Sequence, residues 1–324
     1  MVIDGLNVSN WDSPAVFRSL KEGSVTAINA TIATWENFQE TLDHISGWET
    51  KFSAYEADVL PVRTVDDIAR AKREDKTGVI LGFQNASPIE NDLDRLALFR
   101  ALGVGVIQVT YHERNLLGNG CYERRDDGLS NFGVDAVREM NQVGILIDLS
   151  HVGDRTTLET IELSKKPVAC THANARSYYD VPRNKADEAL KLMAEKGGVV
   201  GATCIRTFLR NAFESTLDDY IDAIDHLVEL LGIDHVGIGT DFTQDQTPSF
   251  WRYIGSQQGT KFPSTFVKAS VDYSQVELYP KGLETPDKMP NVAVALMGRG
   301  YAAGDVAKVL GGNWLRLFRE VWPG

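Results

Sequence analysis

The amino-acid sequence predicts an α/β protein of the (β/α)8 TIM-barrel class, with a long insertion after the eighth strand. Short runs of β-branched residues recur eight times along the 324 residues, and stretches with helical periodicity separate them. Most of these runs are continuously apolar, as expected of parallel strands that are buried on both faces. The expected strands are 2–4, 25–32, 78–84, 104–111, 144–151, 167–172, 198–204 and 235–242.

The intervening stretches have the spacing of amphipathic helices, as in 65–73, 132–141 and 217–231. Thr64 and Thr216 each precede acidic residues and are expected to cap a helix at its first turn. Glycines stand where helices should end, at Gly103, Gly144 and Gly232. Eight such units favour a closed barrel over an open doubly wound sheet, and the G-F-Q-N-A-S run after the third strand lacks the G-x-G-x-x-G spacing of nucleotide-binding sheets.

Composition and charge exclude several classes of function. The chain has 33 basic and 45 acidic residues, a net charge of −12, which disfavours nucleic-acid binding. No apolar run is long enough to span a bilayer, and the opening M-V-I-D-G has no signal-peptide pattern. The three cysteines, Cys121, Cys170 and Cys204, match no zinc or redox motif, which favours reduced thiols. We therefore expect a cytoplasmic protein with a small-molecule substrate.

Residues 1–324 are expected to form a single barrel domain, interrupted by one long segment. Residues 243–300 follow the eighth strand and are too long for an ordinary loop between a strand and a helix. At this position the insertion should lie on the catalytic face, as a lid, a substrate wall or a dimer contact.

Active sites of such barrels lie at the carboxyl-terminal ends of the strands, which selects candidate residues without an alignment. The fifth strand ends at His151, the sixth at His172 and the eighth at Asp241. Because adjacent strands lie about 4.8 Å apart, the two imidazoles can converge on one ion, such as zinc or a similar divalent metal. Asp241 could then accept a proton from bound water. Asn174 follows His172 and is a candidate substrate-binding residue.

Other candidate catalytic residues in the sequence have less support. The nucleophile motif G-x-S-x-G does not occur, and Cys170 is expected to be a buried structural residue, although it points to the same side as His172. His44 and His226 fall within helical stretches, where we expect surface or packing roles.

Several long motifs resemble the membrane (renal) dipeptidase family of the amidohydrolase superfamily. They are G-L-S-N-F-G-V-D-A-V-R-E-M-N-Q-V-G-I-L-I-D-L-S-H-V at 128–152, P-V-A-C-T-H-A-N-A-R with V-P-R-N at 181–184, V-G-I-G-T-D-F at 236–242, and V-L-G-G-N-W-L-R-L-F at 309–318. The resemblance runs over essentially the whole chain in the expected order. It implies a zinc-dependent barrel hydrolase, often dimeric, that cleaves dipeptides and related amides.

The resemblance also implies roles for individual residues. His151 and His172 match histidines that bind one of two zinc ions, and Asp241 matches the aspartate that handles the proton of the bridging water. Arg183 matches an arginine that holds the substrate carboxylate. A residue near the reacting carbonyl corresponds to either Tyr111 or His112.

This chain departs from the family at the other metal ligands. The family has H-x-D after the first strand, where this chain has Leu6-Asn7-Val8, and a bridging glutamate on the third strand, where Gln84 stands. Leu6 and Val8 cannot bind a metal, and a neutral amide is a weaker ligand than a carboxylate. The two-zinc mechanism is therefore not expected, and at most one ion should be held by His151 and His172, assisted by Gln84 or Asp241.

Three hypotheses follow from the sequence. The first is a dipeptidase-like hydrolase with at most one metal ion, which acts on dipeptides, N-acyl amino acids or small amides. The second is a metal-free enzyme that uses Tyr111, His112, His172 and Asp241 for acid–base chemistry on a small metabolite. The third is an inactive barrel that binds a carboxylate-bearing metabolite. For each, we expect a homodimer, as the family resemblance implies.

Overall fold

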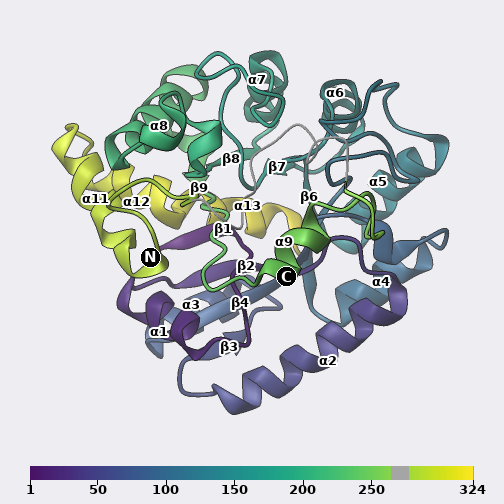
Figure 1. Cartoon of the computed structure of the whole chain (residues 1–324), viewed down its shortest axis with the longest axis horizontal. Helices are drawn as coiled ribbons and strands as arrows, with labels where there is room; N and C mark the ends of the chain where they lie inside the picture. The colour runs from purple at the N-terminus through teal and green to yellow at the C-terminus, as the bar shows by residue number, and fades with distance from the viewer. Residues whose placement is uncertain (264–276, 324) are drawn as a thin grey trace.

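The structure, a computed structural model that describes residues 1–263 and 277–323, has a closed barrel of eight parallel strands at its centre (Figure 1). This confirms the predicted fold class. Each barrel strand overlaps one of the eight predicted runs. The barrel strands are β1 (Ile3–Asn7), β2 (Ala27–Ala33), β4 (Thr77–Phe83), β5 (Val104–Gln108), β6 (Leu146–Asp148), β7 (Ala169–Cys170), β8 (Val199–Ala202) and β9 (Val236–Ile238).

Parallel pairing closes the barrel in chain order. β1 pairs with β9 through Asp4 and Ile238, and with β2 from Ile3 and Ala27 onward. β2 pairs with β4 along its whole length, and each later strand pairs with the next. Because all strands run in the same direction, their carboxyl-terminal ends, and the residues that follow them, gather at one mouth.

A ninth strand was not predicted from the sequence. β3 (Val59–Pro61) pairs with Thr77–Val79 at the start of β4, and β5 begins to pair with β4 further along, at Leu81. The run V-L-P-V at 59–62 is short and contains a proline, which is typical of an edge position rather than of a central strand. β3 therefore extends the sheet at one edge without entering the barrel.

Helices surround the barrel, and their ends follow local sequence signals. Thr64 and Thr216 form capping boxes with Asp67 and Asp219, and Gly144 ends its helix in the left-handed conformation, as predicted. The helices are α1 (Pro14–Glu22), α2 (Phe38–Ala54), α3 (Val65–Arg73), α4 (Asp94–Ala101), α5 (Asn131–Val143), α6 (Asp154–Leu163), α7 (Asp187–Glu195), α8 (Leu217–Leu231), α9 (Pro248–Ile254), α11 (Met289–Gly298), α12 (Ala303–Ala307) and α13 (Asn313–Val321).

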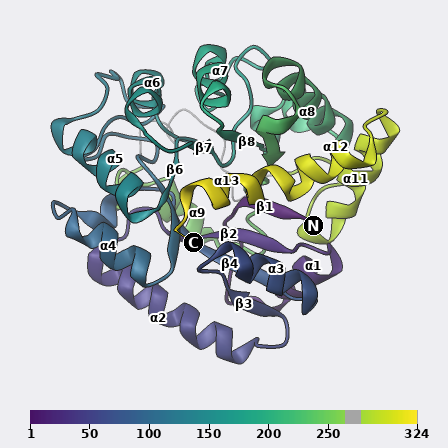
Figure 2. The ribbon, with the colours of Figure 1, turned by 180° about the vertical axis from the view of Figure 1, so that it is seen from behind.

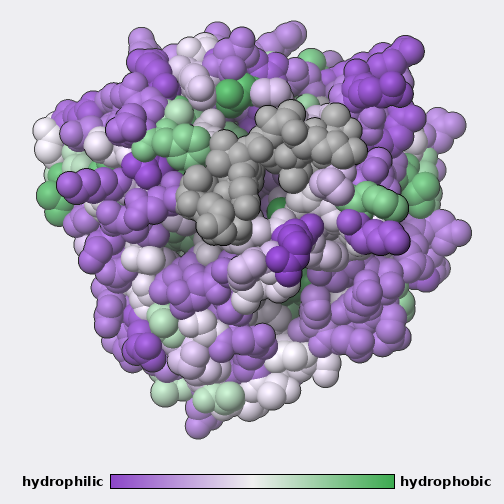
Figure 3. Space-filling view, viewed as in Figure 1, coloured by the Kyte–Doolittle hydropathy of each residue, from purple (hydrophilic) through white to green (hydrophobic). Residues whose placement is uncertain are grey.

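The predicted insertion contains helices that lie in different places, α9 in front of the barrel and α11 in the outer layer of helices. α9 lies in front of the barrel in Figure 1, on the side opposite to α13. Residues 264–276 lie outside the described residues, and α11, near the end of the predicted insertion, contacts α8 in the outer layer. On the face seen in Figure 3, hydrophobic residues are scattered among hydrophilic ones. That residues 1–324 form one domain, with 243–300 inserted on the catalytic face, stays a prediction.

The C-terminal helix α13 lies across the back of the barrel (Figure 2). The fully buried indole of Trp314 donates a hydrogen bond of 2.9 Å to the carbonyl oxygen of Ile238. It packs so closely on neighbouring strands that a Cβ at Gly5 or Gly237 would lie 2.5 Å from it. The barrel strands therefore need glycine at these positions because α13 supplies the bulk that fills the space.

Replacing Trp314 by alanine should destabilise the protein by about 3–5 kcal/mol, because the cavity left beside the glycines cannot collapse and the Ile238 carbonyl loses its donor. Urea unfolding followed by circular dichroism measures this loss. Val294→Ala, at a side chain that is 65% exposed, is the control and should change stability by less than about 0.5 kcal/mol. A loss below about 1 kcal/mol for Trp314→Ala would contradict the packing role.

Candidate active site

Two buried histidines meet at the mouth of the barrel. His151 follows β6 and His172 follows β7, and their Nε2 atoms lie 2.7 Å apart. Burial lowers the pKa of both imidazoles well below the usual value, and the positive charge of Arg183 lowers it further. Both rings are therefore neutral at pH 7, in a form that presents nitrogen lone pairs.

The hydrogen-bond network assigns the protons on this pair. The Thr171 hydroxyl donates to Asp148 over 2.6 Å, so its oxygen accepts from Nδ1–H of His172 over 2.8 Å. A neutral His172 then has an unprotonated Nε2, and the short contact to His151 requires Nε2–H on that ring. Among the described residues, Nδ1 of His151 is buried without a hydrogen-bond partner. The arrangement orients a nitrogen lone pair of His172 towards His151.

Two buried aspartates hold the strand ends that carry the site residues. Asp148 accepts from both the backbone N–H and the hydroxyl of Thr171, the residue before His172. In the same way, Asp4 on β1 accepts from the backbone N–H of Thr240 over 2.8 Å and from its hydroxyl over 2.6 Å. Thr240 precedes Asp241, so each carboxylate fixes the backbone beside one candidate functional residue.

Asp241 has the electrostatics of a general base. Burial raises its pKa from 3.8 to about 7, the charges of Asp4 and Asp148 act in the same direction, and Arg183 opposes them. Its backbone φ of 60° is unusual for a residue other than glycine. The main chain is held there by a hydrogen bond from its N–H to the Leu6 carbonyl and one from the Tyr279 hydroxyl to its own carbonyl. The conformation is thus imposed by tertiary contacts.

Tyr111 and His112 both contact the imidazole pair, so the structure brings together both candidates from the fourth predicted strand. The Tyr111 ring stacks on His151 at 4.2 Å between centroids, and His112 lies 4.7 Å from the same ring. Burial, followed by the charge of Asp241, raises the pKa of Tyr111 well above 10. Tyr111 therefore keeps its proton and can donate a hydrogen bond.

Arg183 and Asn174, the predicted substrate-binding residues, are both buried. Arg183 donates to the carbonyl oxygens of Ser150 and His172, and its Nε has no partner among the described residues. Asn174 uses its amide group on the backbone, donating to the Thr203 and Phe208 carbonyls and accepting from the Thr203 N–H. Arg183 thus has a donor to offer, whereas the Asn174 amide chiefly holds a loop in place.

The first metal position of the family lacks ligands in this structure. Leu6 and Val8 are buried, at 2% and 5% exposure, and neither offers a lone pair. Gln84 donates from its side-chain amide to Thr31 over 3.0 Å. Within residues 1–263 and 277–323, no three His, Cys, Asp or Glu side chains are placed to hold a metal ion. The described residues do not fit a two-ion centre, and the paired imidazoles are the nitrogen donors available for one ion.

The sequence selected His151, His172 and Asp241 as candidate residues, and their role stays a prediction, but it did not identify the residues that hold them in place. Asp148 and Asp4 were not singled out as positioning residues, although both belong to strand runs that contain the motifs I-D-L-S-H and I-D-G. An aspartate inside an otherwise apolar strand was the available signal, because a buried carboxylate must find donors nearby.

Comparisons with known proteins identify the family of this chain. The family model described as membrane dipeptidase (peptidase family M19) matches residues 7–256 and 251–322. The chain therefore belongs to the membrane dipeptidase family. It is 26% identical over 288 residues to a dipeptidase, tcpJ, of Claviceps purpurea, with 88% of this chain and 60% of that protein covered. It is 28% identical over 290 residues to an uncharacterised dipeptidase of Schizosaccharomyces pombe, with 87% and 62% covered.

Solved structures show the same fold. An amidohydrolase from Pseudomonas aeruginosa superposes with a TM-score of 0.94 at 40% identity, with 99% of this chain and 96% of that chain covered. A metallo peptidase from Rhodobacter sphaeroides, bound to a phosphinate mimic of the dipeptide L-Ala-D-Ala, gives 0.82 at 21% identity, with 99% of both chains covered. The present chain spans only about three fifths of the first two curated relatives.

The raised pKa of Asp241 should make stability depend on pH. The folded protein holds a proton up to about pH 7 that the unfolded chain releases near 3.8, so ionisation destabilises the fold as pH rises between these values. As pH rises from about 4 to about 7, the free energy of unfolding of the unchanged protein should fall by up to roughly 4 kcal/mol relative to that of Asp241→Asn. This follows from about 1.4 kcal/mol for each unit of pKa difference.

Urea unfolding of both proteins in the presence of a chelator, at several pH values from about 4 to 8, tests this linkage. Val294→Ala, which changes no titratable group at an exposed position, is the control and should keep the pH dependence of the unchanged protein. A stability difference between Asp241→Asn and the unchanged protein that stays constant with pH would refute the raised pKa.

Proposed function

We propose that this protein is a dipeptidase-like hydrolase that cleaves dipeptides or a related small amide, such as an N-acyl amino acid, with at most one metal ion. One observation carries the proposal: the neutral His151–His172 pair lies at the same barrel mouth as Asp241, whose pKa is raised to about 7. Family membership supports the reaction class, since the matching curated relatives are named dipeptidases.

The residues of the site can divide the work of amide hydrolysis. Asp241 can accept a proton from the attacking water and return it to the leaving amine, because its pKa lies near neutrality. Arg183 can hold the substrate carboxylate with its unpartnered Nε–H. Tyr111 keeps its proton and can donate to the oxygen of the reacting carbonyl, and His112 is the alternative donor.

A divalent ion, zinc or a similar metal, would be held by His151 and His172, with Gln84 as the weaker third candidate. The Thr171–Asp148 support of His172 is typical of a metal-binding imidazole. When bound, such an ion lowers the pKa of water and polarises a carbonyl. The identity of the ion, the homodimer and the cytoplasmic location stay predictions. No helix among residues 1–263 and 277–323 is long and apolar enough to cross a membrane.

The second candidate is a metal-free enzyme or an inactive family member that binds a small carboxylate-bearing metabolite. The apolar Leu6 and Val8 at the first metal position favour it. A buried arginine would serve such binding equally well. The two candidates differ in turnover and in metal content.

Elemental analysis of the purified protein, combined with a dipeptide and N-acyl amino acid panel, tests the proposal. We expect at most one ion per chain, lost in His151→Ala, and hydrolysis that a chelator suppresses. Asp241→Asn should lower kcat by about 10²- to 10⁴-fold, the usual contribution of a general base. His226→Ala, a histidine whose ring contacts Ser177 and Tyr178, is the matched control and should retain both metal and activity.

Two ions per chain would contradict the altered site. Hydrolysis that survives both complete chelation and Asp241→Asn would contradict the mechanism. Tight calorimetric binding of a dipeptide without turnover and without metal would favour the second candidate.

A further inference from the structure

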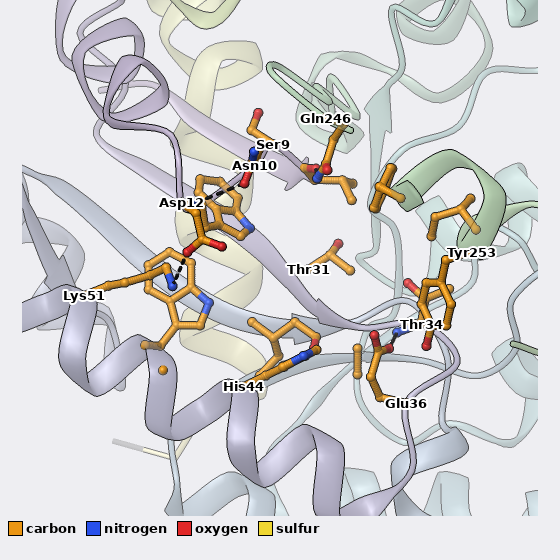
Figure 4. Close-up of a pocket in the computed structure, with 18 of the residues that line it drawn as sticks. Ser9, Asn10, Asp12, Thr31, Thr34, Glu36, His44, Lys51, Gln246 and Tyr253 are labelled. Carbon is orange, nitrogen blue, oxygen red and sulfur yellow. Dashed lines mark hydrogen bonds and ion pairs between the residues drawn. The ribbon is translucent and has the colours of Figure 1, made fainter. Parts of the chain in front are cut away.

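A second recess lies beside the candidate active site, and no residue of it takes part in the proposed hydrolysis. It has a volume of about 290 Å³, is open to solvent on one side, and is lined by residues of the segments that follow β1 and β2 and of helices α2 and α9. Figure 4 shows Lys51 of α2 beside Asp12 of the loop after β1, Glu36 and Tyr253 on the opposite side, and His44 of α2 between Lys51 and Glu36. We call it the α2–α9 pocket.

The pocket borders the reactive centre on the side where the family's first metal ligands are missing. Val8 and Thr31 line it, and the Thr31 hydroxyl accepts the hydrogen bond from Gln84. Trp35, between the lining residues Thr34 and Glu36, packs edge-on against Tyr111 with ring centroids 5.1 Å apart. A substrate at the imidazole pair could therefore extend one end towards the pocket.

The pocket wall carries an excess of negative charge. Asp12, Glu36 and Asp43 line it, against one cation, Lys51, which forms an ion pair with Asp12 at 2.8 Å. Glu36 is held rigidly, since its carboxylate accepts from the backbone N–H groups of Thr34 and Trp35 and is hydrogen-bonded to Tyr253. Glu36 is therefore fixed, whereas the Asp12 side chain is 83% exposed and Asp43 is also exposed. The three carboxylates outnumber the one ammonium group, and this net negative charge favours a positively charged ligand.

Aromatic rings form much of the remaining wall. Trp11 and Trp48 lie 5.3 Å apart between ring centroids, and Phe250 and Tyr253 of α9 also line the pocket. The negative faces of such rings attract ammonium groups and also pack on apolar carbon. A ligand with a cationic group on an apolar portion would interact favourably with both the carboxylates and the aromatic rings of the lining.

His44 adds an acceptor. Its Nδ1 lies 2.7 Å from the Ile32 carbonyl oxygen, which can only accept, so Nδ1 carries the proton. In the neutral ring, Nε2 is then a lone-pair acceptor suited to an ammonium N–H. The sequence had given this residue a surface or packing role, and the structure places it in the lining of the pocket.

We propose that the α2–α9 pocket binds an organic ammonium group of the substrate, carried on an apolar or aromatic portion. This inference rests on the proposed function, because it specifies the class of dipeptide or amide on which that site acts. The carboxylates supply the charge, the four rings supply the apolar contact, and His44 supplies an acceptor.

Isothermal titration with two probes of the same shape, benzylamine and benzyl alcohol, tests the pocket without any scissile bond. Benzylamine, which carries the ammonium group, should bind more tightly than benzyl alcohol. Lys51→Gln removes the only lysine or arginine that the described residues contribute to the pocket lining and should tighten benzylamine binding, whereas Asp12→Asn should weaken it, each by about three- to tenfold. The double variant restores the net charge and should return affinity towards that of the unchanged protein.

Glu49→Gln is the control, with a charge change on α2 outside the lining, and should leave binding unchanged. Equal binding of benzylamine and benzyl alcohol, or shifts of the same sign in Lys51→Gln and Asp12→Asn, would overturn the inference. If hydrolysis is found but benzylamine does not bind, the pocket proposal alone fails. If benzylamine binds as expected but no amide is cleaved, the proposed hydrolysis alone fails.

Discussion

The site depends on two buried carboxylates that bind the backbone and hydroxyl of a threonine on a neighbouring strand. Asp148 holds Thr171 and Asp4 holds Thr240, and each threonine precedes a residue of the reactive centre. Burial raises the pKa of Asp4 to about 6, which is the electrostatic cost of placing a carboxylate there. In exchange, the two carboxylates fix the backbone next to His172 and Asp241, which follow strands far apart in the sequence.

The same burial gives the reactive groups their protonation states. It lowers the pKa of the two imidazoles and raises that of Asp241, with Arg183 lowering all three. Desolvation thus favours the neutral form of each group, while the guanidinium opposes protonation of the histidines and favours ionisation of the aspartate. Neutral imidazoles beside a carboxyl that titrates near neutrality form a centre able to move a proton at physiological pH.

The departures from the family concentrate on one side of the mouth. Where the family has metal ligands after the first strand, this chain has buried apolar side chains, and the α2–α9 pocket begins at one of them, Val8. The histidine side of the centre, by contrast, keeps its supports through Thr171 and Asp148. Substrate recognition on the altered side would then depend on the charge and shape of the pocket rather than on an ion.

Much of the fold, and the candidate residues of the site, could be predicted from the sequence alone. Apolar runs fixed the eight barrel strands, capping residues fixed the starts of α3 and α8, and the strand-end rule selected His151, His172 and Asp241. These are local properties, since hydrogen bonding and side-chain burial within a short segment decide them. The short edge strand β3 was not predicted, because its run of residues is brief and contains a proline.

Only the tertiary structure decided how these local elements act together. Trp314 fills space left by glycines on the barrel strands, Asp4 reaches Thr240 across 236 positions of sequence, and residues of α2, including His44, line the same pocket as residues of α9. Each of these contacts joins segments that are brought together by closure of the barrel. A sequence pattern records which face of a strand is buried, but it does not record which distant side chain buries it.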